Sequence, residues 1–402
     1  MKKMLIDILS LFLTLSLFSC GGSNGDNKRK TSGESPNTDI PSSPVDVSKS
    51  NAMAVYAHYM PWFVAPEASG VWNHWTMSAN ALANGNLASH YTPLTGAYSS
   101  TDVDILDYQC LLMKYSGIDG VIIDWCGSAN KNDYPTIEKG TAAMVNATRK
   151  AGLKFAICYD EQTALNAGTY PDVNDAVVQG RLDMTYLQNN YISKSNYLME
   201  KGSPVLLIFG PARVTGVSDW ATILFPLKNV LVAALNPSAM NSNTQKDSPG
   251  TFLWVNPNPD YSAVSSWTPY LGDAMPGFWD VYKEHGGTSY TTYDREGGAL
   301  FTHQLSAAKD AGLKYLQIST WNDYGEGTTI EPTSEYQYKY LTLLQQFTGV
   351  VYDQKSLELI YKWYTLKKKY AGNTIKTTVL GNAYQYLIAL QPDHAKSLID
   401  AL

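Results

Sequence analysis

Residues 309–323, Lys-Asp-Ala-Gly-Leu-Lys-Tyr-Leu-Gln-Ile-Ser-Thr-Trp-Asn-Asp, join the end of a helix to a strand through a glycine turn. Gly312 suits the left-handed residue that closes a helix, and Lys309 in the last helical turn complements the helix dipole. The apolar run 315–320 is typical of a short buried strand. The stretch therefore predicts a helix, a tight turn and a buried strand that leads into an acidic residue.

This helix–turn–strand pattern recurs along the chain. Further copies occupy residues 114–125, 149–161 and, more loosely, 199–210. Weaker apolar segments supply the remaining strands: 54–59, 229–235, 252–255 and 277–281. Eight apolar strands that alternate with helices over this length predict an α/β fold, the (β/α)8 or TIM barrel. The alternative is an open doubly wound sheet, which would need a glycine-rich phosphate turn, and the sequence has no GxGxxG or Walker motif.

Helices are expected between these strands and after them. Thr101 and Asp104 form a capping-box pattern at the start of one helix, and Pro135 suits the first turn of the next. From about residue 350 the chain changes character, because amphipathic stretches follow one another without strands. Additional C-terminal helices are expected around Leu357, Ile360, Tyr361 and Tyr364, over 382–390, and after Pro392. They would close the bottom or the side of the barrel.

The chain begins with the pattern of a secretory signal. Lys2 and Lys3 precede an apolar stretch at 8–18 that is too short to span a bilayer. Its ending, Leu-Phe-Ser-Cys at 17–20, resembles the lipobox of bacterial lipoproteins, which implies lipidation of Cys20. A plain signal peptide that is cut elsewhere is the alternative. The pattern predicts a lipid-anchored protein of the bacterial cell envelope, at the cell surface or in the periplasm.

Composition divides the chain into three parts. Residues 1–19 are the expected lipoprotein signal peptide. Residues 20–50 are rich in Ser, Gly, Pro and Asn and almost lack large apolar side chains, so we expect a flexible tether there. Residues 51–402 are long enough for one large domain, and we assign them, with the C-terminal helices, to the barrel.

Composition also excludes some partners and sites. The net charge is -6 and the Lys and Arg residues are scattered, so we expect no nucleic-acid partner. Apart from the cysteine of the lipobox, Cys110, Cys126 and Cys158 cannot all pair, and a single disulfide stays an open alternative. No spacing along the sequence resembles a zinc site. We therefore expect no metal and no cofactor, and contact with a membrane through the lipid anchor alone.

The strand at 315–320 leads into a segment, 321–332, that contains three carboxylates, two aromatic side chains and two glycines. Asp323 and Glu326 lie three residues apart where the glycine content disfavours a stable helix. Paired carboxylates beside aromatic rings suit sugar chemistry, because one acid protonates a leaving oxygen while the other works as base or nucleophile. The alternative is an Asx- and Gly-rich turn whose acids only cap local backbone groups.

Other acidic residues follow other predicted strands. Asp124 ends the strand in 114–125, and Asp160 and Glu161 end the strand in 149–161. The catalytic groups of a (β/α)8 barrel lie at the carboxyl ends of its strands, so we expect these acids near the pair at 323 and 326. Their repeated placement favours the catalytic interpretation over the turn.

Candidate substrate contacts are the polar and aromatic residues at these strand ends. They are Tyr59, Trp62, His74, Trp75, Asp124, Trp125, Asp160, Glu161, Trp321, Asn322, Tyr324 and Glu331. Tryptophan at a barrel mouth stacks on sugars or packs loops, and we expect about half of the four to touch substrate. Asp124 is either a hydrogen-bonding residue or a catalyst. For Glu331, next to a proline, we expect anchoring of the loop more than hydroxyl binding, and Asn322 is expected to orient one of the acids through its amide.

Several motifs of the chain occur together in one known family. They are Tyr-Met-Pro-Trp-Phe at 59–63, Trp-Asn-His-Trp at 72–75, and the segments 91–102, 117–125, 276–280 and 294–298. They resemble glycoside hydrolase family 99, the endo-α-mannosidases and endo-α-mannanases. The string Trp-Asn-Asp-Tyr-Gly-Glu at 321–326 is closer to family 71, the α-1,3-glucanases, whereas its continuation at 327–331 is like family 99.

The resemblance implies Glu326 as the general acid and Asp323 as the base that, in family 99, deprotonates the sugar 2-hydroxyl. In that family both acids are Glu, and Asp323 is one methylene shorter. An inverting reaction, with Asp323, Asp124 or Asp160 activating water, also suits the shorter acid. The sequence thus predicts a glycosidase without cofactor that binds polysaccharide or oligosaccharide and cuts an α-linked mannan or glucan internally, by endo action. A barrel that has lost catalysis and only binds glycan is the second hypothesis.

Overall fold

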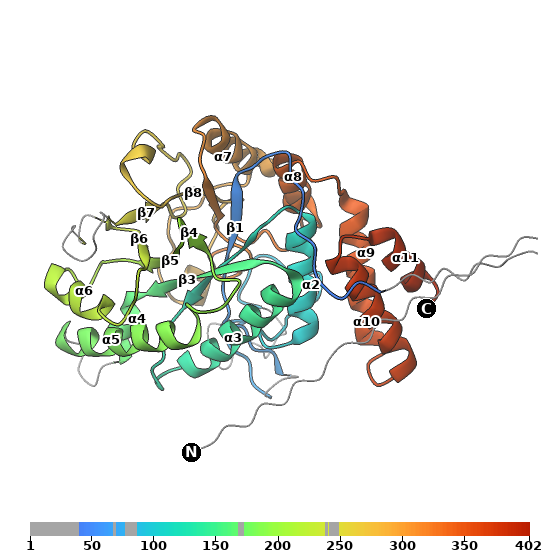
Figure 1. The fold of residues 1–402 in the computed structure, drawn as a ribbon, viewed down its shortest axis with the longest axis horizontal. Coiled ribbons are helices and arrows are strands. Elements are labelled where there is room, and N and C mark those ends of the chain that lie inside the picture. Colours follow the sequence, from blue (N-terminus) through green and yellow to red (C-terminus); the bar gives the residue numbers. More distant parts are fainter. Residues whose placement is uncertain (1–39, 67–69, 77–86, 168–172, 238–239, 241–248) are drawn as a thin grey trace, which may run out of the picture. The chain divides into compact units, whose positions relative to one another are not determined.

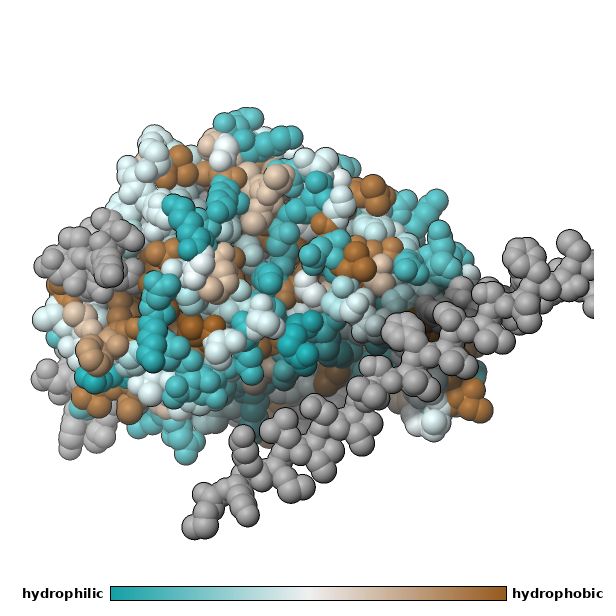
Figure 2. Space-filling model, viewed as in Figure 1, coloured by the Kyte–Doolittle hydropathy of each residue, from teal (hydrophilic) through white to brown (hydrophobic). Residues whose placement is uncertain are grey.

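The computed structural model describes residues 40–66, 70–76, 87–167, 173–237, 240 and 249–402. The expected signal peptide, Cys20 and the first part of the tether lie outside this range. Within it, no helix has the length and apolar character needed to cross a membrane. Figure 2 shows polar and apolar residues intermingled over the face in view.

Eight parallel strands close into a barrel at the centre of the fold (Figure 1). In chain order they are β1 (Ala54–Tyr59), β2 (Gly120–Trp125), β3 (Lys154–Asp160), β5 (Ser203–Phe209), β6 (Leu231–Ala234), β7 (Gly250–Phe252), β8 (Tyr270–Ala274) and β9 (Tyr315–Ile318). The pairing of β1 with β9 and of β3 with β5 closes the sheet. A two-residue strand, β4 (Met199–Glu200), pairs antiparallel with β5. The (β/α)8 prediction is therefore confirmed.

Helices surround the barrel. They are α2 (Val103–Tyr115), α3 (Tyr134–Ala151), α4 (Glu161–Ala167), α5 (Val173–Asn190), α6 (Val217–Leu224), α7 (Ala299–Asp310) and α8 (Lys339–Thr348). The short 3-10 helix η3 (Val264–Ser266) lies between β7 and β8, and η4 (Lys283–His285) and η5 (Glu296–Gly298) lie between β8 and α7. The N-cap of α2 is Asp102, one residue later than the expected capping box, and it accepts the N–H of Asp104. Pro135 lies in the first turn of α3 as expected.

Two of the weaker strands were placed wrongly by the sequence. The strand expected at 277–281 is absent, and β8 lies just before it. The strand expected at 252–255 ends at Phe252 instead. Residues 277–281 nevertheless have the pattern of a strand for a physical reason: the N–H groups of Trp279 and Val281 donate to the carbonyls of Glu326 and Gly325, so the segment bonds to the loop after β9.

Three further helices follow the barrel: α9 (Gln354–Lys369), α10 (Thr374–Ile388) and α11 (Pro392–Asp400). Helix α9 packs along α2, so this group covers the side of the barrel (Figure 1). Helix α10 begins eight residues before the expected position at 382. The first two turns of α10 lack a regular apolar stripe, so the sequence pattern did not predict them.

The last residues of the expected tether contact the domain. The N–H of Val45 donates to the carbonyl of Ile388 over 3.1 Å, and the N–H of Ser50 donates to that of Gly349 over 3.3 Å. The ammonium of Lys49 donates to a carboxylate oxygen of Asp119. The part of the chain that is fixed on the barrel thus begins before residue 51.

Candidate active site

Four carboxylates gather at the carboxyl end of the barrel. Asp124 is the penultimate residue of β2, Asp160 is the last residue of β3, and Asp323 and Glu326 lie in the loop after β9. Burial raises the pKa of Asp124 well above its usual range, and the nearby charges of Asp160 and Asp323 raise it further. The structure therefore brings together four of the acids that the sequence singled out.

Asp323 and Glu326 are directly connected. The N–H of Glu326 donates to Oδ1 of Asp323 over 3.0 Å, and the N–H of Asp323 donates to the hydroxyl of Thr320 over 2.7 Å. The first of these bonds is the local cap that the turn interpretation expected, but it uses a single oxygen of the carboxylate. On the other side, the hydroxyl of Tyr282 donates to Oε1 of Glu326 over 3.3 Å.

The two carboxyls differ in their electrostatic surroundings. Burial raises the pKa of Asp323 to about 6, while the N–H of Glu326 and the nearby His74 act in the opposite direction. Burial and the charge of Asp323 raise the pKa of Glu326 well above its usual range, against the hydrogen bond from Tyr282. Burial thus acts on both carboxyls, and the adjacent charge of Asp323 makes Glu326 hold its proton more firmly. Different surroundings of this kind suit a pair of carboxyls in which one works as a base and the other as an acid.

Asp160 shares this environment. Burial raises the pKa of Asp160 to about 6, although the N–H of Gln162 lowers it. Its neighbour Glu161 does not face the site. The Glu161 carboxylate is buried and accepts the N–H groups of Ala212, Arg213 and Val214, so it fastens the loop after β5. The expectation that Glu161 contacts substrate is therefore corrected.

Five aromatic candidates lie in the core and do not face the site. Trp75, Trp125, Trp321, Tyr59 and Tyr324 are all buried among other side chains. The indole N–H of Trp125 donates to Glu138, that of Trp75 to the carbonyl of Tyr98, and the hydroxyl of Tyr59 to Gln109. Trp125 follows Asp124 directly, and neighbouring residues of a strand point to opposite sides, so Trp125 faces the helices. Substrate contact by these five rings is not supported.

A buried polar network explains two further candidates. Glu331 accepts the hydroxyls of Tyr98 and Tyr324 and the amide of Gln109 over 2.7–2.9 Å. Burial raises the pKa of Glu331 to about 7 against these donors. Asn322 accepts the N–H of Met60 over 2.8 Å and donates to its carbonyl over 2.9 Å. Glu331 thus anchors its loop as expected, whereas Asn322 joins the loop to the end of β1 and does not orient the acids.

Trp62 and His74 remain partly accessible. Their rings stack with centroids 4.9 Å apart and planes inclined by 15°. The Nε2 atom of His74 lies 2.7 Å from Oδ2 of Asp133, and this hydrogen bond lowers the pKa of Asp133 to about 2. His74 acts electrostatically on Asp323. The pair therefore lies beside the acids and can contact a ligand there.

Comparisons with known proteins bear on the fold. No protein-family model matches the chain. A mouse protein named glycoprotein endo-alpha-1,2-mannosidase-like protein is 22% identical over 357 residues, which cover 77% of this chain and 75% of that one. Its human counterpart of the same name is 22% identical over 322 residues, 69% and 68% of the two chains. The structure of the GH99 endo-alpha-mannosidase from Bacteroides thetaiotaomicron is 17% identical and covers 77% of this chain and 99% of that chain with a TM-score of 0.57. The chain has a GH99-like fold.

Sequence reasoning missed an exposed tryptophan of this GH99-like barrel. Trp279 is 47% exposed, and its N–H donates to the carbonyl of Glu326 over 3.0 Å. His90 stacks on one face of its indole, with centroids 3.6 Å apart and planes inclined by 12°. His90 in turn lies 2.7 Å from Glu284. The ring is therefore fixed by one face beside the acid pair. Trp279 lies in the segment 277–281, which the sequence analysis assigned to a strand, so it was not selected as a substrate contact.

The GH99-like barrel also holds polar side chains in its interior that the sequence analysis did not select. Asp273 on β8 is buried and accepts the hydroxyl of Ser319 over 2.7 Å. Burial raises the pKa of Asp273 to about 7. His58 on β1 and Cys158 on β3 face the same interior, next to Asp124. Side chains of a strand alternate between its two faces, but both faces of these strands are buried, so the sequence carried no signal that singled out these residues.

Proposed function

We propose that the chain is a glycosidase that cleaves α-mannosidic linkages within a glycan, with Glu326 as the general acid and Asp323 as the general base. The observation that carries the proposal is the hydrogen bond from the backbone N–H of Glu326 to the Asp323 carboxylate, together with the raised pKa values of both carboxyls. The names of the two mammalian relatives and the GH99-like fold support the substrate class. The likeness of 321–326 to family 71 leaves α-1,3-glucan as the comparison substrate.

The geometry suits a division of labour between the acids. Glu326, whose pKa burial and the charge of Asp323 raise, donates its proton to the glycosidic oxygen as that bond breaks. The Tyr282 hydroxyl holds Oε1 of Glu326, which orients the carboxyl. In the same step Asp323 accepts the proton of the attacking hydroxyl, from the sugar 2-OH or from water, and the oxygen of that hydroxyl bonds to the anomeric carbon as the glycosidic bond breaks. Each carboxyl then differs from its resting state by one proton.

We further propose that the expected lipoprotein signal places the enzyme in the bacterial cell envelope. Glycan outside the cell would then reach the barrel mouth.

Trp62, His74 and Trp279 are accessible rings beside the acids, and sugars stack on such rings.

The proposal is tested by reducing-end release from α-mannan and α-1,3-glucan. We expect release of oligosaccharides from α-mannan and none from α-1,3-glucan. Release from the glucan alone would overturn the substrate class but keep the glycosidase. Silence on both polymers, with binding measured by calorimetry, would favour a glycan-binding protein that has lost catalysis.

A further inference from the structure

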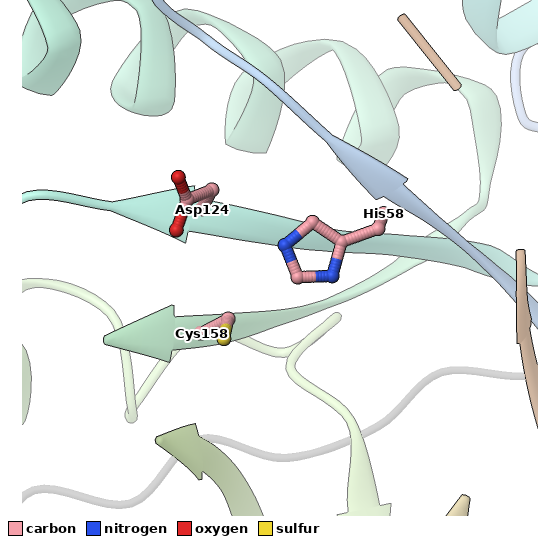
Figure 3. A group of neighbouring side chains, drawn as sticks. All are labelled: His58, Asp124 and Cys158. Atoms are coloured by element: carbon pink, nitrogen blue, oxygen red, sulfur yellow. The ribbon is translucent and has the colours of Figure 1, made fainter. Parts of the chain in front are cut away.

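Three side chains of different chemistry meet inside the barrel. His58 on β1, Asp124 on β2 and Cys158 on β3 come from adjacent strands and point toward one another (Figure 3). A ring nitrogen, a carboxylate oxygen and the sulfur all lie within 4.8 Å of one another. In the sheet, Asp124 lies opposite Cys158 and His58 opposite Ile122, so the strand register itself sets this meeting.

The surroundings of His58 leave one ring nitrogen for a ligand. Gln317 donates its amide to the carbonyl of Leu253, which turns the oxygen of the amide toward His58. That oxygen lies 3.4 Å from Nδ1 of His58, so Nδ1 carries the hydrogen and Nε2 presents its lone pair. The ring of Trp254 packs edge-on against the imidazole of His58, with ring centroids 4.6 Å apart, and this fixes the plane of the imidazole. No described residue forms a hydrogen bond with Nε2.

Asp124 is poorly compensated where it lies. Its carboxylate forms no hydrogen bond with the residues that the structure describes. The charged groups that act on it are Asp160 and Asp323, both negative. The Asp124 carboxylate is partly exposed and lies beside other acids, so a bound cation would stabilise its charged form. Cys158, fully buried, offers the third donor atom, and its sulfur accepts the backbone N–H of Phe209.

We propose that His58, Asp124 and Cys158 form a site for a divalent transition metal such as Zn²⁺, through Nε2, a carboxylate oxygen and the thiolate. Imidazole, carboxylate and thiolate are the donors that this borderline-soft ion prefers, and three protein ligands leave a fourth position open. The Nδ1–H of His58 donates to the amide oxygen of Gln317. A metal-bound histidine usually donates its other ring N–H in a hydrogen bond of this kind. Donor atoms of a tetrahedral zinc site lie about 3.5 Å apart, so the side chains move closer by about an ångström when the ion binds. Binding releases the thiol proton to solvent.

Because the three residues are distant in the sequence, no spacing motif reveals the site. The proposal does not depend on glycosidase activity, and its test uses binding alone. Failure of the proposed function and failure of this site are therefore distinguishable.

The purified full chain is titrated with Co²⁺, which replaces Zn²⁺ and reports a thiolate ligand through sulfur-to-cobalt charge-transfer absorption. We expect saturation at one Co²⁺ per chain and displacement by Zn²⁺. Cys158→Ser should abolish the absorption band, and His58→Gln and Asp124→Asn should weaken Co²⁺ binding at least about tenfold. Cys110→Ser removes another fully buried thiol, on α2, and should leave band and affinity unchanged.

Gln317→Met tests the role of the residue behind His58. We expect it to keep the band and to weaken Co²⁺ binding by about 10- to 100-fold, because it positions His58 and is no ligand itself. Thermal unfolding without metal checks that each variant is folded. No charge-transfer band in the wild type, or a band that survives Cys158→Ser, would overturn the proposal. If one ligand variant fails to fold, the wild-type spectrum and the other two ligand variants decide between these outcomes.

Discussion

At the scale of single residues, the chemistry depends on how burial and local hydrogen bonds balance on each carboxyl. Asp323 is 6% exposed, yet backbone N–H groups keep its pKa at about 6. Glu326, with one weak hydroxyl donor and an anion beside it, has a pKa well above its usual range. Different surroundings of two similar side chains are what the proposed roles of Glu326 as acid and Asp323 as base require.

This balance predicts the pH dependence of kcat/KM on α-mannan. Asp323 works as a base only when ionised, so activity should rise with pH through about 6. Glu326 works as an acid only when protonated, so activity should fall at higher pH as it ionises. The resulting profile is a bell. A profile that stays flat from about pH 5 to about pH 8, with the protein folded throughout, would contradict the assignment.

The buried hydrogen bonds of Glu331 should contribute to the free energy of unfolding. In Glu331→Gln, an amide NH2 replaces an oxygen that accepts hydroxyl or amide donors, so a buried donor loses its partner. We expect a decrease in the free energy of unfolding of about 1–3 kcal/mol, measured by urea denaturation. Glu358→Gln on the exposed face of α9 is the control and should change it by less than about 0.5 kcal/mol. Equal stability of Glu331→Gln and wild type would show that Glu331 does not anchor the loop.

At the scale of elements, strand alternation decided which candidates reached the site. Asp124 and Trp125 are neighbours on β2, but Asp124 lies inside the barrel and Trp125 lies against the helix layer. The sequence located the strand ends correctly, because apolar runs followed by acids mark them. It could not tell which neighbour faces inward, since both faces of a barrel strand are buried and the pattern shows no alternation of apolar and polar residues.

The segment after β8 predicts a sugar contact. His90 stacks on one face of the Trp279 indole, and the backbone N–H of Trp279 donates to the carbonyl of Glu326. The exposed part of the indole is left for a ligand. Trp279→Ala should raise KM for α-mannan about tenfold or more. Losing the aromatic side chain on which a ring stacks costs about 1–3 kcal/mol of binding free energy. The effect on kcat should be smaller.

Phe225→Ala is the matched control for this variant. Phe225 is also an exposed aromatic side chain, but it follows α6, whose carboxyl end lies at the opposite end of the barrel. Its kinetic constants should equal those of the wild type. Equal constants for Trp279→Ala would exclude the indole from substrate binding.

At the scale of the whole molecule, the C-terminal helices belong to the same folded unit as the barrel. Helix α9 packs on α2, and Trp363 lies fully buried between α9 and α10, where its indole N–H donates to the carbonyl of Leu380 over 2.9 Å. Residues 45–51 add contacts to α8 and α10. The barrel and these helices therefore share one core.

Trp363→Ala should lower the free energy of unfolding by about 3–5 kcal/mol, the usual cost of removing a large buried ring. Ile375→Ala, at an exposed position of α10, should have little effect. Circular dichroism and tryptophan fluorescence should report one coincident transition in both variants. Two separate transitions in the wild type would show that the helices form an independent domain.

The repeated pattern of helix, glycine and strand was sufficient to predict the barrel, because each copy encodes one local unit of the fold. The placement of Asp323 and Glu326 together followed from their closeness in sequence. Asn322 and Glu161 could not be assigned, since their partners come from β1 and from the loop after β5. The meeting of His58 with Cys158 likewise depends on strand register, which single-sequence patterns do not contain.

The most direct test of the account compares wild type with Glu326→Gln on two substrates that differ in leaving group. On α-mannan, whose leaving alcohol needs a proton, the variant should lose about 10²- to 10⁴-fold in kcat. On an α-mannosyl oligosaccharide with a dinitrophenolate leaving group, which departs without protonation, it should keep most of the wild-type rate. Undiminished release from α-mannan by Glu326→Gln, or an equal loss on both substrates, would contradict Glu326 as the general acid.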